Sequence, residues 1–356
     1  MRPPQGVCAL LVVACVALGA CDAKDDLKPV PQASPSPPGL KFTASSFTAE
    51  ASTKSGSSGI VVDGLTGIQM VDANTGYAVG GPRMILKTTD GGQTWARAAG
   101  QAEATNWTRL EAFTDLAFLN AQHGFVLAPS GCFRTMDGGA SWVRVPEFKA
   151  GFVYSAMQFY GPTEGVAIGP QVPLLHTSDG GATWQEEPND AAGQPLMISR
   201  VADLGSIGGS PAFLGTAFMI RQAEGWRALK QPQGGGFAFH FRDAQNGWMV
   251  GATLYKTFDG ASSWVDTVTD PAWAPGMRVR VLGDAEAWIA TGASVAWTNT
   301  GGVQWLRGKL VDPFDPGNRS VYQDAITFAH SGLQVVGPND VWFANGTKAL
   351  YHYTGN

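Results

Sequence analysis

The sequence predicts an all-β fold built from a repeated unit, on three observations. A turn-like string, TTDGGQTW at residues 88–95, recurs at 135–142 and 177–184 with the same shape. The tryptophans at the ends of these and looser copies, at positions 95, 142, 184, 226, 264 and 305, differ by 47, 42, 42, 38 and 41. The chain is rich in glycine, with 46, and only 15% charged, as suits tightly turned antiparallel sheet. A steady period near forty residues indicates a repeat architecture.

The recurring string is a hairpin turn with an aromatic residue at its end. Thr and Asp side chains bond nearby backbone N–H groups, glycines adopt the left-handed conformations of a tight turn, and the tryptophan buries its ring against the sheet. Looser copies run over 257–264, over 298–305, where Thr300 replaces the aspartate, and up to Trp226. We therefore predict a structural role, in the stability of the turns, for the aspartates of the four copies that keep one: Asp90, Asp137, Asp179 and Asp259.

The string resembles the Asp-box, or bacterial neuraminidase repeat, whose pattern is Ser/Thr-x-Asp-x-Gly-x-Thr-Trp. In families that carry it, the box lies on the outer edge of a β-propeller blade, away from the active centre. The resemblance therefore implies a propeller and gives the boxes no catalytic or metal-binding role.

Each unit is expected to hold four strands. In the first unit we expect strands at 68–71, 77–80 and 84–87, with a fourth that begins at Trp95. Units with the same first two strands follow at 114–128, 155–169, 237–251 and 277–291, a degenerate unit fills 198–230, and a last unit, 332–353, stops after its third strand. The prediction is a seven-bladed propeller of four-stranded antiparallel blades.

The incomplete last unit predicts how the ring closes. It would leave an exposed sheet edge, which a strand from the other end of the chain can cover. Residues 42–50, which alternate Phe, Ser and Thr, are the first candidate, and residues 59–63 are the competitor.

The N-terminal region predicts a lipoprotein. The apolar run at 7–18 is too short to span a bilayer and is typical of a secretory signal, and the following Leu-Gly-Ala-Cys resembles a bacterial lipobox that would make Cys21 the lipidated first residue. The alternative is an ordinary cleaved signal with an incidental cysteine. We expect a signal at 1–21, a Pro-rich tether at 22–39 and the propeller at 40–356, held at the bacterial cell envelope by a lipid anchor, in the periplasm or another extracytoplasmic place. Only Cys132 would remain free in the mature chain, so no intramolecular disulfide is expected.

Binding residues are expected on one face of the propeller. The long connections, at 100–113, 187–197, 268–276 and 308–325, should cluster around one mouth of the channel, opposite the box turns. Aromatic and arginine side chains, which are enriched at protein interfaces, gather in or beside these and neighbouring connections. The candidates are Arg83, Trp107, Arg109, Trp273, Arg278, Arg280, Arg319 and Tyr322. The alternative is that they are scattered surface residues.

Other functions find less support. A net charge of −5 gives no sign of nucleic-acid binding, the five histidines are dispersed without metal-ligand spacing, and no cofactor is expected. A carbohydrate-active enzyme or a glycan-binding propeller is the alternative function. Sialidases share the box, but their Arg-Ile-Pro-like motif is absent. A carboxylate pair could come from Glu111 with Asp115 or from Asp312 with Asp315.

The unit GYAVG…ILKTTDGGQTW at 76–95 also resembles that of the photosystem II stability/assembly factors of cyanobacteria and chloroplasts. The likeness covers roughly residues 40–356. It implies a seven-bladed propeller, a lipid anchor in the cyanobacterial members, and a non-catalytic scaffold that binds a protein partner. We therefore expect a membrane-anchored assembly or stability factor for a membrane or envelope complex.

Overall fold

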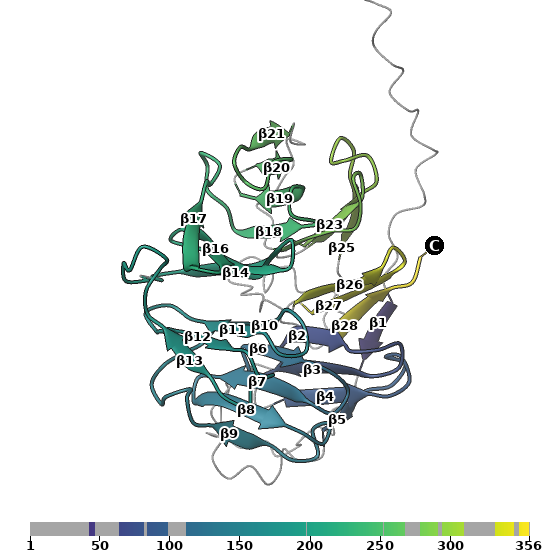
Figure 1. Ribbon diagram of the computed structural model, residues 1–356. Helices are drawn as coiled ribbons and strands as arrows, with labels where there is room; N and C mark the ends of the chain where they lie inside the picture. The colour runs from purple at the N-terminus through teal and green to yellow at the C-terminus, as the bar shows by residue number, and fades with distance from the viewer. Residues whose placement is uncertain are drawn as a thin grey trace, which may run out of the picture. The chain divides into compact units, whose positions relative to one another are not determined.

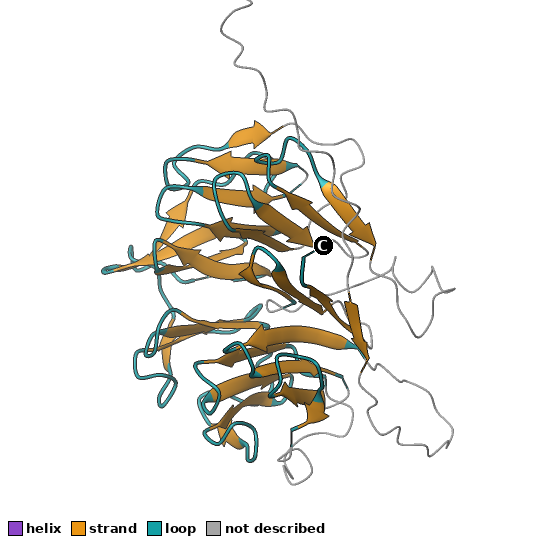
Figure 2. Cartoon of the chain, turned by 90° about the vertical axis from the view of Figure 1, so that its right-hand side faces the viewer, coloured by secondary structure: helices purple, strands orange, loops and turns teal. Residues whose placement is uncertain are grey.

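The structure is a computed structural model that describes residues 43–46, 64–81, 84–98, 112–196, 198–251, 253–267, 278–290, 294–309, 332–344 and 349–355. The regular elements in these ranges are all β-strands, which form seven antiparallel sheets of four strands each (Figures 1 and 2). This confirms the predicted all-β, seven-bladed fold. Within the described residues, no helix is long and apolar enough to cross a membrane.

Each sheet is one blade, and its strands follow one another in chain order, apart from the closing strand of the last. Blade 1 is β2 (Leu65–Met70), β3 (Gly76–Gly80), β4 (Met84–Thr88) and β5 (Ala96–Arg97). Blade 2 is β6 (Asp115–Phe118), β7 (Gly124–Ala128), β8 (Gly131–Thr135) and β9 (Val143–Val145). Blade 3 is β10 (Ala156–Phe159), β11 (Gly165–Ile168), β12 (Leu174–Thr177) and β13 (Gln185–Glu187). Blade 4 is β14 (Val201–Ile207), β15 (Ser210–Gly215), β16 (Phe218–Gln222) and β17 (Gly225–Leu229).

The remaining three blades complete the ring. Blade 5 is β18 (Ala238–Phe241), β19 (Gly247–Val250), β20 (Leu254–Thr257) and β21 (Val265–Thr267). Blade 6 is β22 (Arg278–Val281), β23 (Ala287–Ala290), β24 (Ser294–Thr298) and β25 (Leu306–Lys309). Blade 7 is β26 (Leu333–Gly337), β27 (Asp340–Ala344), β28 (Ala349–Tyr353) and β1 (Thr43–Ser46). The first strand of each blade contacts the first strand of the next, and β26 contacts β2, so these seven inner strands surround a central channel.

The ring closes with the N-terminal strand. β1 pairs antiparallel with β28, from Thr43 opposite His352 to Ser46 opposite Ala349, and so covers the edge that blade 7 would otherwise expose. The prediction that residues 42–50 supply this strand is therefore confirmed. The competing segment, 59–63, lies outside the described residues.

Apolar side chains between neighbouring blades form the core. At the interface of blades 1 and 2, Tyr77 and Phe118 are buried and stacked with ring centroids 3.7 Å apart. Between blades 2 and 3, the Trp184 ring packs edge-on against Phe125 at 6.1 Å. The closing tryptophans of these units thus lie at blade interfaces, as aromatic rings with large apolar area should.

The box turns connect the third strand of a blade with its fourth. In blade 2, Thr135 donates its hydroxyl hydrogen to Asp137 at 2.8 Å and accepts the backbone N–H of Gly139 at 2.8 Å. Asp137 also accepts the backbone N–H of Ser141 at 2.8 Å, and Gly138 and Gly139 take φ values of +68° and +90°. The hydrogen bonds from Ser141 lower the pKa of Asp137 to about 2.

The same arrangement recurs in the other boxes. Asp90, Asp179 and Asp259 each accept a backbone N–H from the residue four positions on. Where Thr300 replaces the aspartate, its hydroxyl oxygen accepts the N–H of Gln304 at 2.8 Å instead.

The boxes also take part in contacts between blades, which sequence reasoning missed. The cation that precedes the first threonine of a box donates to a glycine carbonyl in the box of the next blade. These hydrogen bonds run from Lys87 to Gly138, from Arg134 to Gly181 and from Lys256 to Gly301. A box therefore both closes its own hairpin and provides an acceptor to the preceding blade.

We expect Thr135→Val to lower the free energy of unfolding by about 1–3 kcal/mol, because the buried Gly139 N–H loses its acceptor while the side-chain volume is kept. Denaturant unfolding of the variant and the wild type measures this difference. The exposed Val303→Thr is the matched control and should change stability little. Equal stability of Thr135→Val and the wild type would contradict a structural role for the box.

Candidate functional site

The channel wall carries a ring of polar side chains at matching positions of the inner strands. They are paired in register with the second strand of each blade: Gln69 with Tyr77, Gln158 with Val166, His240 with Trp248, Arg280 with Trp288 and Gln334 with Trp342. Ala117 holds the same position in blade 2. We call these six residues the channel ring. Each lies close to the turn that leads from its inner strand into the second strand. The box turns lie at this same end of the blade, so the channel ring is nearer to them than to the long connections.

Three of these side chains, Gln69, His240 and Gln334, bond the inner strand of the following blade. Gln69 accepts the N–H of Phe118 at 2.8 Å and donates to the same residue's carbonyl at 2.9 Å. Gln334 makes the same pair of bonds with Met70, and Nδ1 of His240 accepts the N–H of Val281 at 3.1 Å.

A second set of bonds lies two residues earlier along the inner strands. Asp115 accepts the N–H of Met157 at 2.9 Å, and Asp203 accepts that of Phe239 at 3.0 Å. An inner strand is the edge of its sheet, and its outward N–H groups need acceptors when buried. Side chains of the preceding blade supply them, which stabilises neighbouring blades against each other.

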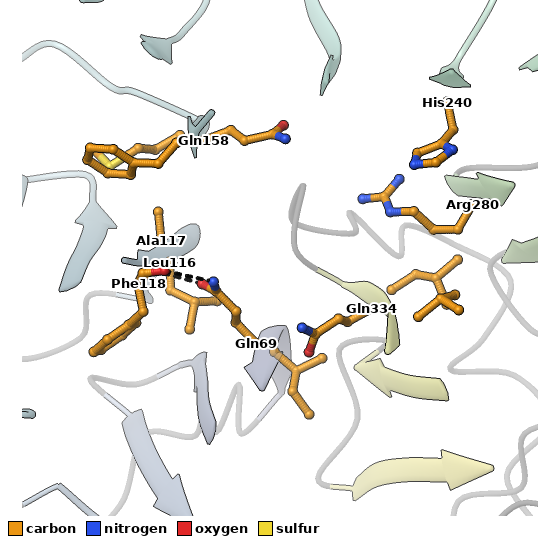
Figure 3. Close-up of a pocket in the computed structure, with 13 residues that line it drawn as sticks. Gln69, Leu116, Ala117, Phe118, Gln158, His240, Arg280 and Gln334 are labelled. Carbon is orange, nitrogen blue, oxygen red and sulfur yellow. Dashed lines mark hydrogen bonds between the residues drawn. The ribbon is translucent and has the colours of Figure 1, made fainter. Parts of the chain in front are cut away.

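The channel ring lines a cavity of about 350 Å³ together with apolar residues such as Leu116, Phe159 and Val335. In Figure 3, Gln158 points across this cavity toward Arg280, whose guanidinium lies beside the His240 ring. Among the described lining residues none is an Asp or a Glu. The described chain also contains no group of three His, Cys, Asp or Glu that could hold a metal ion.

His240 and Arg280 create a positive, donor-rich side of the cavity. Burial lowers the pKa of His240 to about 3, with the Arg280 charge acting in the same direction and Asp203 against it. The His240 imidazole is therefore neutral near pH 7. Burial also lowers the pKa of Arg280, while Asp203 and Asp115 raise it. Both side chains are partly exposed, and they face the channel.

The structure places two of the eight predicted binding residues. Arg278 is buried, and its Nη1 lies 3.4 Å from the Ala202 carbonyl, whereas Arg280 lines the cavity. Both lie on the inner strand β22, which opens the sixth blade as expected. The other six lie outside the described residues: Arg83, Trp107, Arg109, Trp273, Arg319 and Tyr322. Cys21 also lies outside them.

Of the four carboxylates considered for glycoside hydrolysis, only Asp115 lies within the described residues. Asp115 is fully buried and bonds a backbone N–H of the next blade, as a structural side chain does. Glu111, Asp312 and Asp315 lie outside the described residues.

Sequence reasoning missed every member of the channel ring except Arg280. Gln69, Gln158, His240 and Gln334 are single polar residues inside apolar strands, at one matching place of successive repeats. An alignment of the repeats on their second strands would have found them, because each lies eight residues before the second-strand residue that it pairs with.

Comparison with known proteins agrees with this fold. A family model described as photosynthesis system II assembly factor YCF48 matches residues 101–205, which include blades 2 and 3. The chain is 23% identical over 273 residues to the chloroplast photosystem II stability/assembly factor HCF136 of Arabidopsis thaliana, a match that covers 68% of this chain and 66% of that protein.

Two further similarities point the same way. The photosystem II assembly lipoprotein Ycf48 of Synechococcus sp. is 28% identical over 185 residues, which cover 49% of this chain and 43% of that protein. The matches thus span less than two thirds of either curated relative. A solved structure of YCF48 bound to D1 peptide superposes with a TM-score of 0.65 at 17% identity, over 90% of this chain and all of the other. That last likeness shows the fold.

Proposed function

From the resemblance of this Asp-box propeller to the photosystem II stability/assembly factors, we propose that it is a non-catalytic scaffold that binds a protein partner of a membrane or envelope complex. The observation that carries the proposal is the agreement of family model, relatives and fold on proteins named for assembly, one of which is bound to a peptide. The cavity adds support, because its described wall offers amides, an imidazole and a guanidinium but no carboxylate.

The partner binds the face of the long connections. In an antiparallel blade, the turn between the first and second strands and the box turn lie at one end, and the connections to the next blade lie at the other. Trp107, Arg109, Arg319 and Tyr322 belong to these connections in the sequence and have the composition of interface hot spots. Arg278 is left out of the test, because it is buried in the channel wall and its loss would disturb the fold.

Affinity capture from native membranes tests the proposal. We expect the wild type to recover a defined set of membrane proteins. In the loop-face variant, Trp107, Arg109, Arg319 and Tyr322 are all changed to alanine. This variant should recover at least about tenfold less of those proteins. A box-turn variant, with Met136, Phe258 and Val303 changed to serine, is the matched control, because these side chains are 60%, 64% and 75% exposed at the other end of the blades. Equal recovery by all three proteins, or hydrolysis of a glycan by the purified protein, would contradict the proposal.

The scaffold is proposed to be held at the membrane by lipid on Cys21. The relative from Synechococcus is a lipoprotein, which supports this location. Acyl chains on one cysteine give the two hydrophobic attachments that stable anchoring needs. We expect Cys21→Ala to abolish incorporation of labelled palmitate and to leave the membrane fraction; continued labelling and membrane association of the variant would refute the anchor.

A further inference from the structure

Arg280 differs from the other polar members of the channel ring in what it can bond. Gln69, His240 and Gln334 all accept a backbone N–H from the inner strand of the following blade. A guanidinium has only donors, so Arg280 cannot satisfy an edge N–H in this way. Its one hydrogen bond to a described residue goes from Nη1 to the carbonyl of the preceding Val279 at 2.8 Å.

The neighbouring histidine adds a second donor. Because Nδ1 of His240 accepts the N–H of Val281, the neutral ring carries its proton on Nε2. In Figure 3 this ring lies beside the Arg280 guanidinium, at the border of the cavity. Two adjacent blades therefore present N–H donors to the same space.

The nearest acidic groups are already engaged. Asp203 and Asp115 act on the Arg280 charge, but each is fully buried in the channel wall and accepts a backbone N–H of the following blade. Arg278, also buried nearby, adds a second positive charge. A cavity with a fixed cation, a second donor and no acid on its described lining is complementary to an anion.

We propose that the channel cavity is a binding site for a small oxyanion, a carboxylate or a phosphate, held by the Arg280 guanidinium and the Nε2–H of His240. The volume of about 350 Å³ is at the lower end of small-molecule sites, so it suits a compact molecule. The small side chain of Ala117, where blades 1, 3 and 7 have glutamine, leaves room on the wall opposite. This site lies near the box-turn end and is independent of partner binding at the loop face.

Titration calorimetry on the full chain tests the proposal with succinate, phosphate and the uncharged succinamide. We expect one equivalent of succinate or phosphate to bind with a Kd at or below about 1 mM, and succinamide not to bind. Whichever of succinate and phosphate binds more tightly shows whether the site prefers a carboxylate or a phosphate. A change of the His240 Nε2 nitrogen resonance on titration should accompany binding.

Matched variants assign the residues. Arg280→Lys keeps the charge but loses the planar fork and should weaken binding about tenfold or more. His240→Phe loses the donor and should weaken it severalfold, whereas His240→Gln can accept from Val281 and donate to the ligand, and should stay within about threefold of wild type. His352→Gln, in the outer part of blade 7, is the control for a histidine change outside the cavity.

Two results would overturn the proposal. One is the absence of succinate and phosphate binding to folded wild-type protein. The other is binding that Arg280→Lys and His240→Phe leave unchanged while both variants melt cooperatively. Loss of partner capture by the loop-face variant with intact anion binding would separate this site from the proposed scaffold function.

Discussion

Trp342→Ala is expected to lower the free energy of unfolding by about 3–5 kcal/mol. The Trp342 ring is buried in blade 7, where it stacks on His352 at 3.7 Å. It also meets Trp95 of blade 1 edge-on at 6.0 Å, and a side chain added at Gly92 would collide with it. The substitution therefore opens a cavity at the interface that joins the last blade to the first. Denaturant unfolding of the variant measures the loss.

Phe258→Ala is the control for that substitution. Phe258 is an aromatic side chain on a box turn but is 64% exposed, so its removal should change stability by less than about 0.5 kcal/mol. A Trp342→Ala protein as stable as Phe258→Ala would show that the packing of blade 7 on blade 1 does not stabilise the ring.

Stability should fall by roughly 3 kcal/mol between pH 6.5 and pH 4 through His240 alone. Burial, with Arg280 beside it, lowers the pKa of His240 to about 3, below the 6.5 of an unfolded histidine. In this window the unfolded chain binds one proton more than the folded protein, so unfolding becomes easier by about 1.4 kcal/mol for each pH unit lost. The stabilisation is fully present above pH 6.5 and is lost as the pH falls toward 3. Urea unfolding at pH 7 and at pH 4.5 measures the slope.

His240→Gln should flatten this dependence while retaining an acceptor for Val281. The box aspartate Asp137 does not interfere, because its pKa of about 2 keeps it ionised above pH 4. The pKa of His123 is also lowered, by burial and then by Arg134, so His123→Gln measures its separate contribution. An unchanged slope in His240→Gln would mean that His240 titrates normally in the folded protein.

The fold was predictable because its signals are local and repeated. A Thr-x-Asp-Gly-Gly turn followed by tryptophan defines its own hydrogen bonds within a few residues, as the bonds that Ser141 donates to Asp137 show. Three full copies of this turn and three looser ones mark six units of four strands, and a truncated seventh unit follows them. Only the closing strand then remained to be found, and the unpaired edge of the last unit required one. β1 supplies it at the predicted segment.

The channel ring was not predictable in the same way, because its partners lie one blade away. Gln69 and Phe118 are 49 residues apart, and Gln334 and Met70 are 264 apart. Nothing in the sequence around a glutamine tells whether its amide bonds the next strand or faces water. Arg278 and Arg280 also show why the site was hard to predict. They open the sixth blade as expected, but the arrangement of the seven blades places them in the channel wall.

The most direct test of the scaffold function is the affinity of the purified protein for the partner that capture identifies. Biolayer interferometry would compare the wild type, the loop-face variant and the box-turn variant, each shown to be folded by its thermal transition. We expect a Kd at least tenfold higher for the loop-face variant and an unchanged Kd for the box-turn variant. Equal affinity of the loop-face variant and the wild type, or loss of affinity in the box-turn variant, would contradict it.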